Sequence, residues 1–146
     1  MTRSAREILK SSKIVVSPET FFVVSVDHEN FVKLLSDPDR SPRMNSEFLI
    51  FKDKWEVTLV VDSADFGNLG KAIDGASVEG NFRLLSFDAE MGFDVVGFMS
   101  AVASILAAEN ISILPFFSFN RDHVLVKQDD LPKALKAFRG IVSEVC

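Results

Sequence analysis

Residues 93–117 read FDVVGFMSAVASILAAENISILPFF, a stretch that places a helix directly before a strand. Apolar side chains recur there at helical spacing and predict one apolar stripe, made of Val95, Phe98, Met99, Val102, Ile105 and Leu106. The opposite side of the predicted helix carries small residues, which let another helix or sheet approach closely. These are Gly97, Ser100, Ala101, Ser104 and Ala108. Asn110 suits the left-handed turn that ends such a helix. Pro115 cannot donate a ladder hydrogen bond, so the strand that follows is expected at a sheet edge.

The order of elements around this stretch occurs twice along the chain. Extended runs are predicted at 13–26, with a break at Ser17-Pro18, and at 46–51, 55–61 and 81–87. Helices alternate with these runs: Asp27 can cap one, and Asp62 or Ser63 opens another. The second half continues with a helix capped by Asp94, a hairpin around residues 120–121 and a helix after Asp130. The run at 55–61 is expected as a strand, because Trp55, Val57, Leu59 and Val61 alternate with Glu56, Thr58 and Val60.

We therefore predict an α+β fold of two tandem ferredoxin-like βαββαβ repeats, with antiparallel sheets that carry helices on one face. The predicted domains are residues 1–80 and 81–146.

Composition narrows the classes of protein. The formal charge of −5 disfavours a nucleic-acid partner, which a basic surface would attract. The single cysteine, Cys146, excludes an intramolecular disulfide. No window approaches the roughly 20 apolar residues of a membrane span, and the N-terminal MTRSAREILKSSK lacks the apolar core of a secretory signal. We expect a cytoplasmic protein without a membrane partner.

Residues that could carry chemistry are few. His28 and His123 are the only histidines and fall in different repeats, so no metal site is predicted. No nucleophile is paired with a base, and no phosphate or dinucleotide loop occurs, so we expect neither an enzyme nor a cofactor. Phe116, Phe117 and Phe119 could stack on RNA bases, but the strand 122–127 lacks the aromatic residues of that signature, which favours packing or an edge contact.

Residues 82–139 resemble the ACT domain, in the branch of the aspartate kinase regulatory tail and the animal arginine sensors. The resemblance rests on motifs whose order and spacing agree: Phe93, Val96 and Gly97 at a helix start, Ile111-Ser112-Ile113, Ser118 with Asp122, Leu125-Val126, and the segment from Asp129 to Leu135. The first half agrees only in the order of its elements.

The resemblance implies a bound amino acid, held by the first strand–helix loop and a neighbouring edge strand. The implied ligand-binding residues are Met91, Gly92, Phe93, Asp94, Val95, Val96 and Gly97 in the loop, Ile111, Ser112 and Ile113 on the edge, and Asp122 in the hairpin. A ligand carboxylate suits the free amides of a helix start, and Asp94 or Asp122 suits an amino or guanidinium group. Two alternatives stay open: Asp94 as a helix cap, and Gly97 as a close-packing residue.

The leading hypothesis is a non-enzymatic regulatory module that binds an amino acid. A homodimer or a regulated protein is its expected partner. The alternative is a ligand-independent interaction module of the same fold, in which the aromatic edge serves assembly only.

Overall fold

The structure is a computed structural model that describes residues 4–146, so the first three residues of the N-terminal segment considered above lie outside it. The chain divides into two compact units. We call Glu19–Asn81 the inserted unit, and Met1–Pro18 together with Phe82–Cys146 the terminal unit. This division differs from the predicted boundary between residues 80 and 81, because residues up to 18 belong with the second half of the chain.

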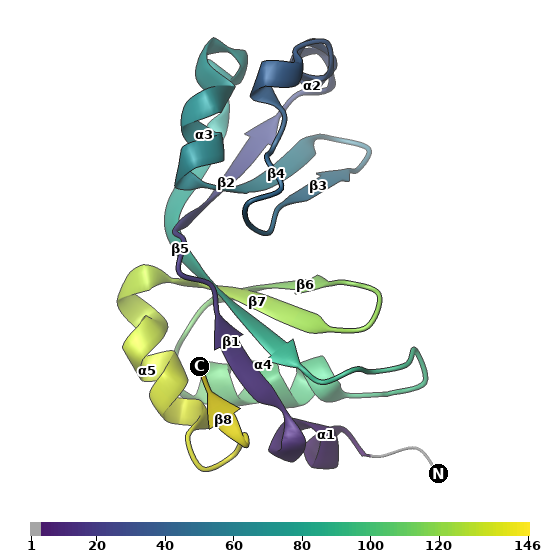
Figure 1. Cartoon of the computed structure of the whole chain (residues 1–146), viewed down its shortest axis with the longest axis vertical. Helices are drawn as coiled ribbons and strands as arrows, with labels where there is room; N and C mark the ends of the chain where they lie inside the picture. The colour runs from purple at the N-terminus through teal and green to yellow at the C-terminus, as the bar shows by residue number, and fades with distance from the viewer. Residues whose placement is uncertain (1–3) are drawn as a thin grey trace. The chain divides into compact units, whose positions relative to one another are not determined.

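The inserted unit alternates strands and helices around a four-stranded sheet (Figure 1). Its elements are β2 (Phe21–Val26), α2 (His28–Leu35), η1 (Pro38–Arg40), β3 (Leu49–Lys52), β4 (Val57–Asp62), α3 (Ser63–Leu69), η2 (Gly70–Ile73) and the start of β5 (Ser77–Asp88). The sheet order is β3-β4-β2-β5, and both β2 and β3 run antiparallel to β4. Leu34 of α2 and Leu69 of α3 are buried in one cluster with inward residues of β2 and β4, so the two helices cover one face of the sheet.

Helix starts in this unit follow the predicted caps. The Asp27 carboxylate accepts a hydrogen bond from the Asn30 amide at 2.7 Å, and that of Asp62 accepts one from the Asp65 amide at 2.8 Å. The strand predicted at 55–61 begins later in the structure. Trp55 lies before it with its side chain 78% exposed, and β4 starts with the fully buried Val57.

The terminal unit joins segments from both ends of the sequence. Its elements are α1 (Ala5–Ser11), β1 (Lys13–Val16), the remainder of β5, α4 (Phe98–Ala108), β6 (Ile113–Phe117), β7 (Asp122–Lys127), η3 (Gln128–Asp130), α5 (Leu131–Phe138) and β8 (Glu144–Val145). Its strands follow the order β6-β7-β5-β1-β8. The edge position of β6 confirms the expectation from Pro115.

Strand β1 explains why the first residues belong to this unit. It runs antiparallel to β5, with Ile14 opposite Phe87, and parallel to β8, with Ile14 opposite Val145. Two further backbone hydrogen bonds join β1 to the β8 end of the chain. The Val16 amide donates to the Cys146 carbonyl at 2.9 Å, and the Cys146 amide donates to the Ile14 carbonyl at 2.8 Å. β1 thus occupies a central place between β5 and β8.

The core of the terminal unit lies between this sheet and helices α1, α4 and α5. Phe87 of β5 makes edge-to-face contacts with Phe98 of α4 and Phe138 of α5, each at 5.5 Å between ring centroids. The predicted stripe of α4 is confirmed at Phe98, Val102 and Leu106, which are buried. The α+β class predicted from the sequence is also confirmed. Across residues 4–146, none of the helices has the length and apolar content needed to cross a membrane.

Candidate functional site

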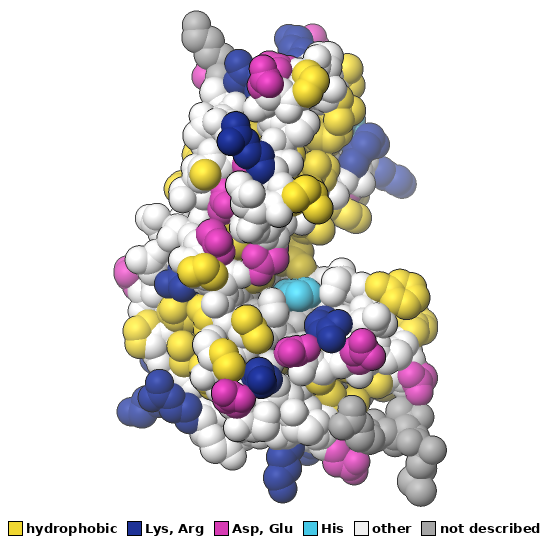
Figure 2. Space-filling view, in the orientation of Figure 1, with side chains coloured by type: hydrophobic (Ala, Val, Ile, Leu, Met, Phe, Trp, Pro, Cys, Tyr) yellow, Lys and Arg dark blue, Asp and Glu magenta, His cyan; other side chains and the backbone are white. Residues whose placement is uncertain are grey.

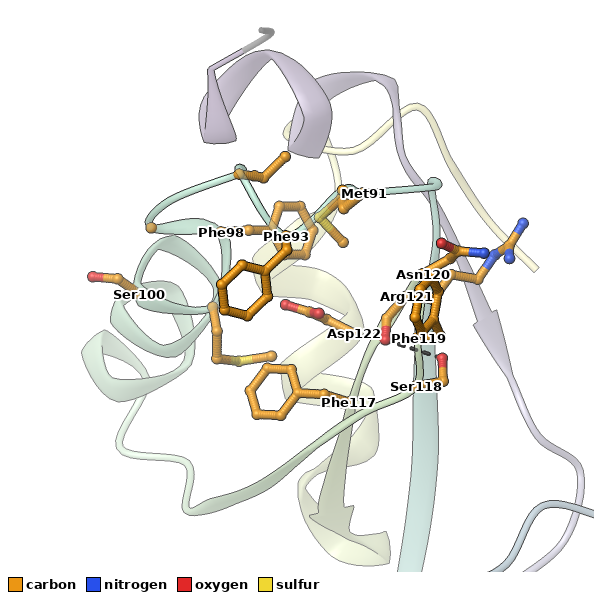
Figure 3. Close-up of a pocket in the computed structure, with 14 residues that line it drawn as sticks. Met91, Phe93, Phe98, Ser100, Phe117, Ser118, Phe119, Asn120, Arg121 and Asp122 are labelled. Atoms are coloured by element: carbon orange, nitrogen blue, oxygen red, sulfur yellow. Dashed lines mark hydrogen bonds between the residues drawn. The ribbon is translucent and has the colours of Figure 1, made fainter.

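A cavity of about 480 Å³ lies in the terminal unit, where the loop between β5 and α4 faces the β6–β7 hairpin (Figure 3). Its volume falls within the roughly 300–1,000 Å³ usual for small-molecule sites. The lining comes from three places: the loop from Met91 to Gly97, the first turn of α4, and the hairpin residues 117–122. The first strand–helix loop and the hairpin therefore meet at one site.

The walls of the cavity are mainly apolar. Met91 and Phe98 form a buried floor, with exposed fractions of 7% and 3%. Phe93, Phe117 and Phe119 line the cavity from exposed positions, and hydrophobic side chains gather over the tip of the β6–β7 hairpin in Figure 2. These rings line the cavity and do not fill it.

Asp122 is the only carboxylate among the residues that line this cavity. It is the first residue of β7, paired with Phe117 of β6 and Phe87 of β5. In Figure 3 its carboxylate points between Phe93 and Phe117, and its partial burial raises the pKa of the group. A cationic group in the cavity would restore the stability of the ionised form that desolvation removes.

Helix α4 begins at the cavity, and it begins later than predicted. Its N-cap is Gly97, not Asp94, and no side chain caps it. Gly97 has a φ of 86°, and a Cβ at this position would meet nothing within 4 Å. The glycine is therefore required by its left-handed backbone and not by close packing. The amides of the first turn, at Phe98, Met99 and Ser100, precede the first intrahelical donor, Ala101, which bonds to Gly97 at 3.0 Å.

The predicted ligand-binding residues divide into two groups. Met91, Gly92, Phe93, Val95, Gly97 and Asp122 line the cavity together. Asp94 is outside the lining, and its carboxylate lies over Gly92, where a Cβ would sit 2.5 Å from Oδ1. Val96 lines a neighbouring cavity.

The predicted edge residues lie elsewhere. Ile111 is buried in the core and donates its amide to Leu106 at 3.0 Å, Ser112 is exposed, and Ile113 begins β6. The cavity is reached by Phe117, at the other end of that strand and about 13 Å away at the usual rise per residue.

The hairpin around residues 120–121 was predicted, but its turn at 118–121 was not among the predicted ligand-binding residues, although it lines the cavity. The Met91 amide donates to the Asn120 carbonyl at 2.8 Å, which ties the turn to the loop. Arg121 forms an ion pair with Asp88 at 2.9 Å, at the end of β5. These contacts depend on the register between β5 and β7, which no local pattern in the sequence reveals.

A second missed feature is a chain of three polar side chains beside the cavity. His123 Nδ1 lies 2.8 Å from the Ser86 hydroxyl, and Nε2 lies 3.0 Å from that of Ser118, which lines the cavity. The Ser118 hydroxyl also donates to the Arg121 carbonyl at 3.1 Å. Because a hydroxyl has one proton, His123 then donates to Ser118 and does not act as its base.

Within residues 4–146 no three side chains of His, Cys, Asp or Glu gather as metal ligands would. The arrangement as a whole is that of an α+β module with a ligand-sized cavity at its β5–α4 loop.

Comparison with known proteins identifies part of this module. Residues 77–140 match the model of the ACT domain family. No curated protein sequence matches the chain.

Solved structures resemble nearly the whole chain in fold. A crystal structure of a protein from Agrobacterium tumefaciens is 18% identical over 93% of this chain and 94% of its own, with a TM-score of 0.71. Aspartate kinase from Clostridium acetobutylicum is 16% identical, over 88% of this chain and 34% of its own, with a TM-score of 0.68. The ligand-free regulatory subunit of aspartate kinase from Thermus thermophilus is 9% identical, over 91% and 98% of the two chains, with a TM-score of 0.63.

Proposed function

We propose that the chain is a regulatory module of tandem ACT-like repeats that binds a small amino acid and acts by binding, not by catalysis. The fold shared with a regulatory subunit of aspartate kinase supports the regulatory role. The order of strands and helices in the inserted unit supports the second repeat. The cavity between the β5–α4 loop and the β6–β7 hairpin is the proposed site.

One observation carries this proposal: the cavity offers complementary charge to both ends of a zwitterion. Asp122 supplies a carboxylate for the ligand ammonium group, and the uncapped first turn of α4 supplies amides with partial positive charge for the ligand carboxylate. The surrounding methionine and phenylalanine side chains then contact the ligand's own side chain. Together these contacts favour an amino acid with an apolar or amphipathic side chain.

A thermal-shift screen with the twenty amino acids tests the proposal. A ligand at about 100 times its Kd adds roughly 2.7 kcal/mol to the free energy of unfolding, which raises Tm by several degrees. Isothermal titration with the best amino acid then gives Kd for wild type and for Asp122→Asn. If no amino acid shifts Tm at millimolar concentration, the chain is not an amino-acid sensor.

The exposed aromatic side chains favour a second candidate, a ligand-independent interaction module. Phe93 and Phe119 are fully exposed and Phe117 is 62% exposed, beside the open edge of β6. This candidate predicts a stable dimer, or a complex with a regulated protein, that amino acids do not change. Light scattering coupled to size exclusion, with and without the best amino acid, separates the two candidates.

A further inference from the structure

A second cavity of about 690 Å³ lies in the terminal unit, between α1, the outer side of α4 and the turn after α5. It is larger than the proposed amino-acid site, and α1 is not part of the segment that matches the ACT family. Most of the small residues of α4 noted in the sequence line it, namely Gly97, Ser100, Ala101 and Ser104. They lie on the side of α4 that contacts α1, and their small size leaves this space open beside the contact.

The charge of this cavity is opposite to that of the chain. Arg6 and Lys10 line it from α1, four residues apart and so on one face of the helix. No aspartate or glutamate is among the lining residues. Over the part of the chain that the structure describes, neither cation forms an ion pair. Two uncompensated positive charges in a chain of net charge −5 attract an anion.

The remaining lining is partly polar and partly apolar. Leu9 is buried with 3% exposure, Val96 is 85% exposed, and Ile105 and Ile141 complete the apolar part. Ser100 and Ser104 add hydroxyl groups from adjacent turns of α4. A ligand that fits has an anionic head group and an apolar body.

We propose that this cavity binds a small organic acid, with its carboxylate at Arg6 and Lys10 and its apolar body against Leu9 and Ile105. The volume suits a free small molecule, because it lies within the usual range of ligand sites. Two cations within one turn of helix provide the bidentate and point-charge contacts that a carboxylate accepts.

The two cavities share residues. Gly97 and Ser100 line both, so the first turn of α4 contacts the occupant of either. The organic acid is therefore expected to change the affinity for the amino acid, and reciprocity requires the same factor in the other direction. This coupling rests on the proposed amino-acid site, whereas binding of the organic acid does not.

Sodium octanoate is the probe, titrated into the full chain without any amino acid and followed by two-dimensional amide NMR. We expect saturable shifts at Leu9, Ser100 and Ser104, at least tenfold weaker binding for Arg6→Gln/Lys10→Gln, and at least tenfold weaker binding of acetate, which lacks the apolar body. The matched control Lys133→Gln/Lys136→Gln removes the same charge from exposed positions of α5 and should keep Kd within twofold. Circular dichroism confirms that both variants are folded.

The proposal is overturned if millimolar octanoate causes no shifts in α1 and α4. It is also overturned if the two double variants bind octanoate equally, or if octyltrimethylammonium binds as tightly as octanoate. Co-sedimentation with phosphatidylserine vesicles, or binding of a glutamate-rich peptide, in the absence of octanoate binding also overturns it. The octanoate titration contains no amino acid, so its failure is distinct from a failure of the amino-acid site.

Discussion

Asp122 has the most direct chemical role at the scale of single residues. It stands at the start of β7, in a cavity whose lining includes two methionines and four phenylalanines. Burial raises its pKa, so the folded protein holds an ionised group that lacks part of its hydration. A ligand ammonium group compensates for that loss.

We expect Asp122→Asn to weaken amino-acid binding roughly tenfold to a hundredfold, because a hydrogen bond to a charged group contributes about 1.5–3 kcal/mol. Isothermal titration measures this change. Asp129→Asn is the control, since Asp129 is exposed in η3 and outside the cavity. An unchanged Kd for the Asp122 variant would remove this residue from the site.

The raised pKa of Asp122 also predicts how stability depends on pH. The pKa is higher in the folded than in the unfolded chain, so the stabilising contribution of the protonated group is complete below the unfolded pKa. It is lost as pH rises through the folded pKa. Asp122→Asn cannot titrate, so it should be at least as stable as wild type at neutral pH. Urea denaturation between pH 3 and 8 measures this, and lower stability of the variant at pH 7 would contradict it.

At the scale of elements, helix α4 shows how far the sequence can specify a site. Its apolar stripe and its end at Asn110, with a φ of 58°, follow from residue types and spacing alone. The residue at which α4 starts cannot be predicted in this way. Aspartate is a favourable N-cap residue, so the sequence also allows a start at Asp94. The choice between Asp94 and Gly97 depends on the route of the whole loop, which includes a contact between Met91 and the distant Asn120.

Gly97→Ala tests the start of this helix. Alanine in this left-handed backbone conformation should lower the free energy of unfolding by about 1–2 kcal/mol. No steric clash adds to this, because a Cβ at this position meets nothing within 4 Å. Gly67→Ala is a matched control in α3, at a helical position with equally free space, where alanine should stabilise by roughly 0.5–1 kcal/mol. Chemical denaturation measures both, and equal effects would exclude the backbone of Gly97 as the cause.

At the scale of the molecule, the order of helices and strands could be predicted from the sequence. Which strands belong to which of the two units could not. The break at Ser17-Pro18 is visible in the sequence as a turn, and the structure places a boundary between units there. Whether β1 pairs with β2 or with β5 depends on long-range register. Short runs of β-branched residues, such as 13–16 and 21–26, carry no signal for that choice.

The position of β1 gives a prediction for truncation. A chain that lacks residues 1–18 loses the strand between β5 and β8 and the buried side chains of Ile8, Leu9 and Ile14. We expect its terminal unit to lose dispersed amide NMR signals, while residues 19–81 keep theirs. A synthetic peptide of residues 4–18 added in excess should restore part of the lost spectrum. Unchanged signals from β5 and α4 in the truncated chain would contradict this role of β1.

The central place of β1 also has a consequence for biosynthesis. The segment that forms α1 and β1 leaves the ribosome before its partner strands, β5 and β8, and β8 lies as far along the chain as residue 145. At about 5–20 residues per second, this delay amounts to several seconds or more. Residues 19–81 are contiguous and can fold meanwhile. Throughout that interval Ile8, Leu9 and Ile14 have no folded partner, which makes the nascent chain a substrate for chaperones that bind short apolar segments.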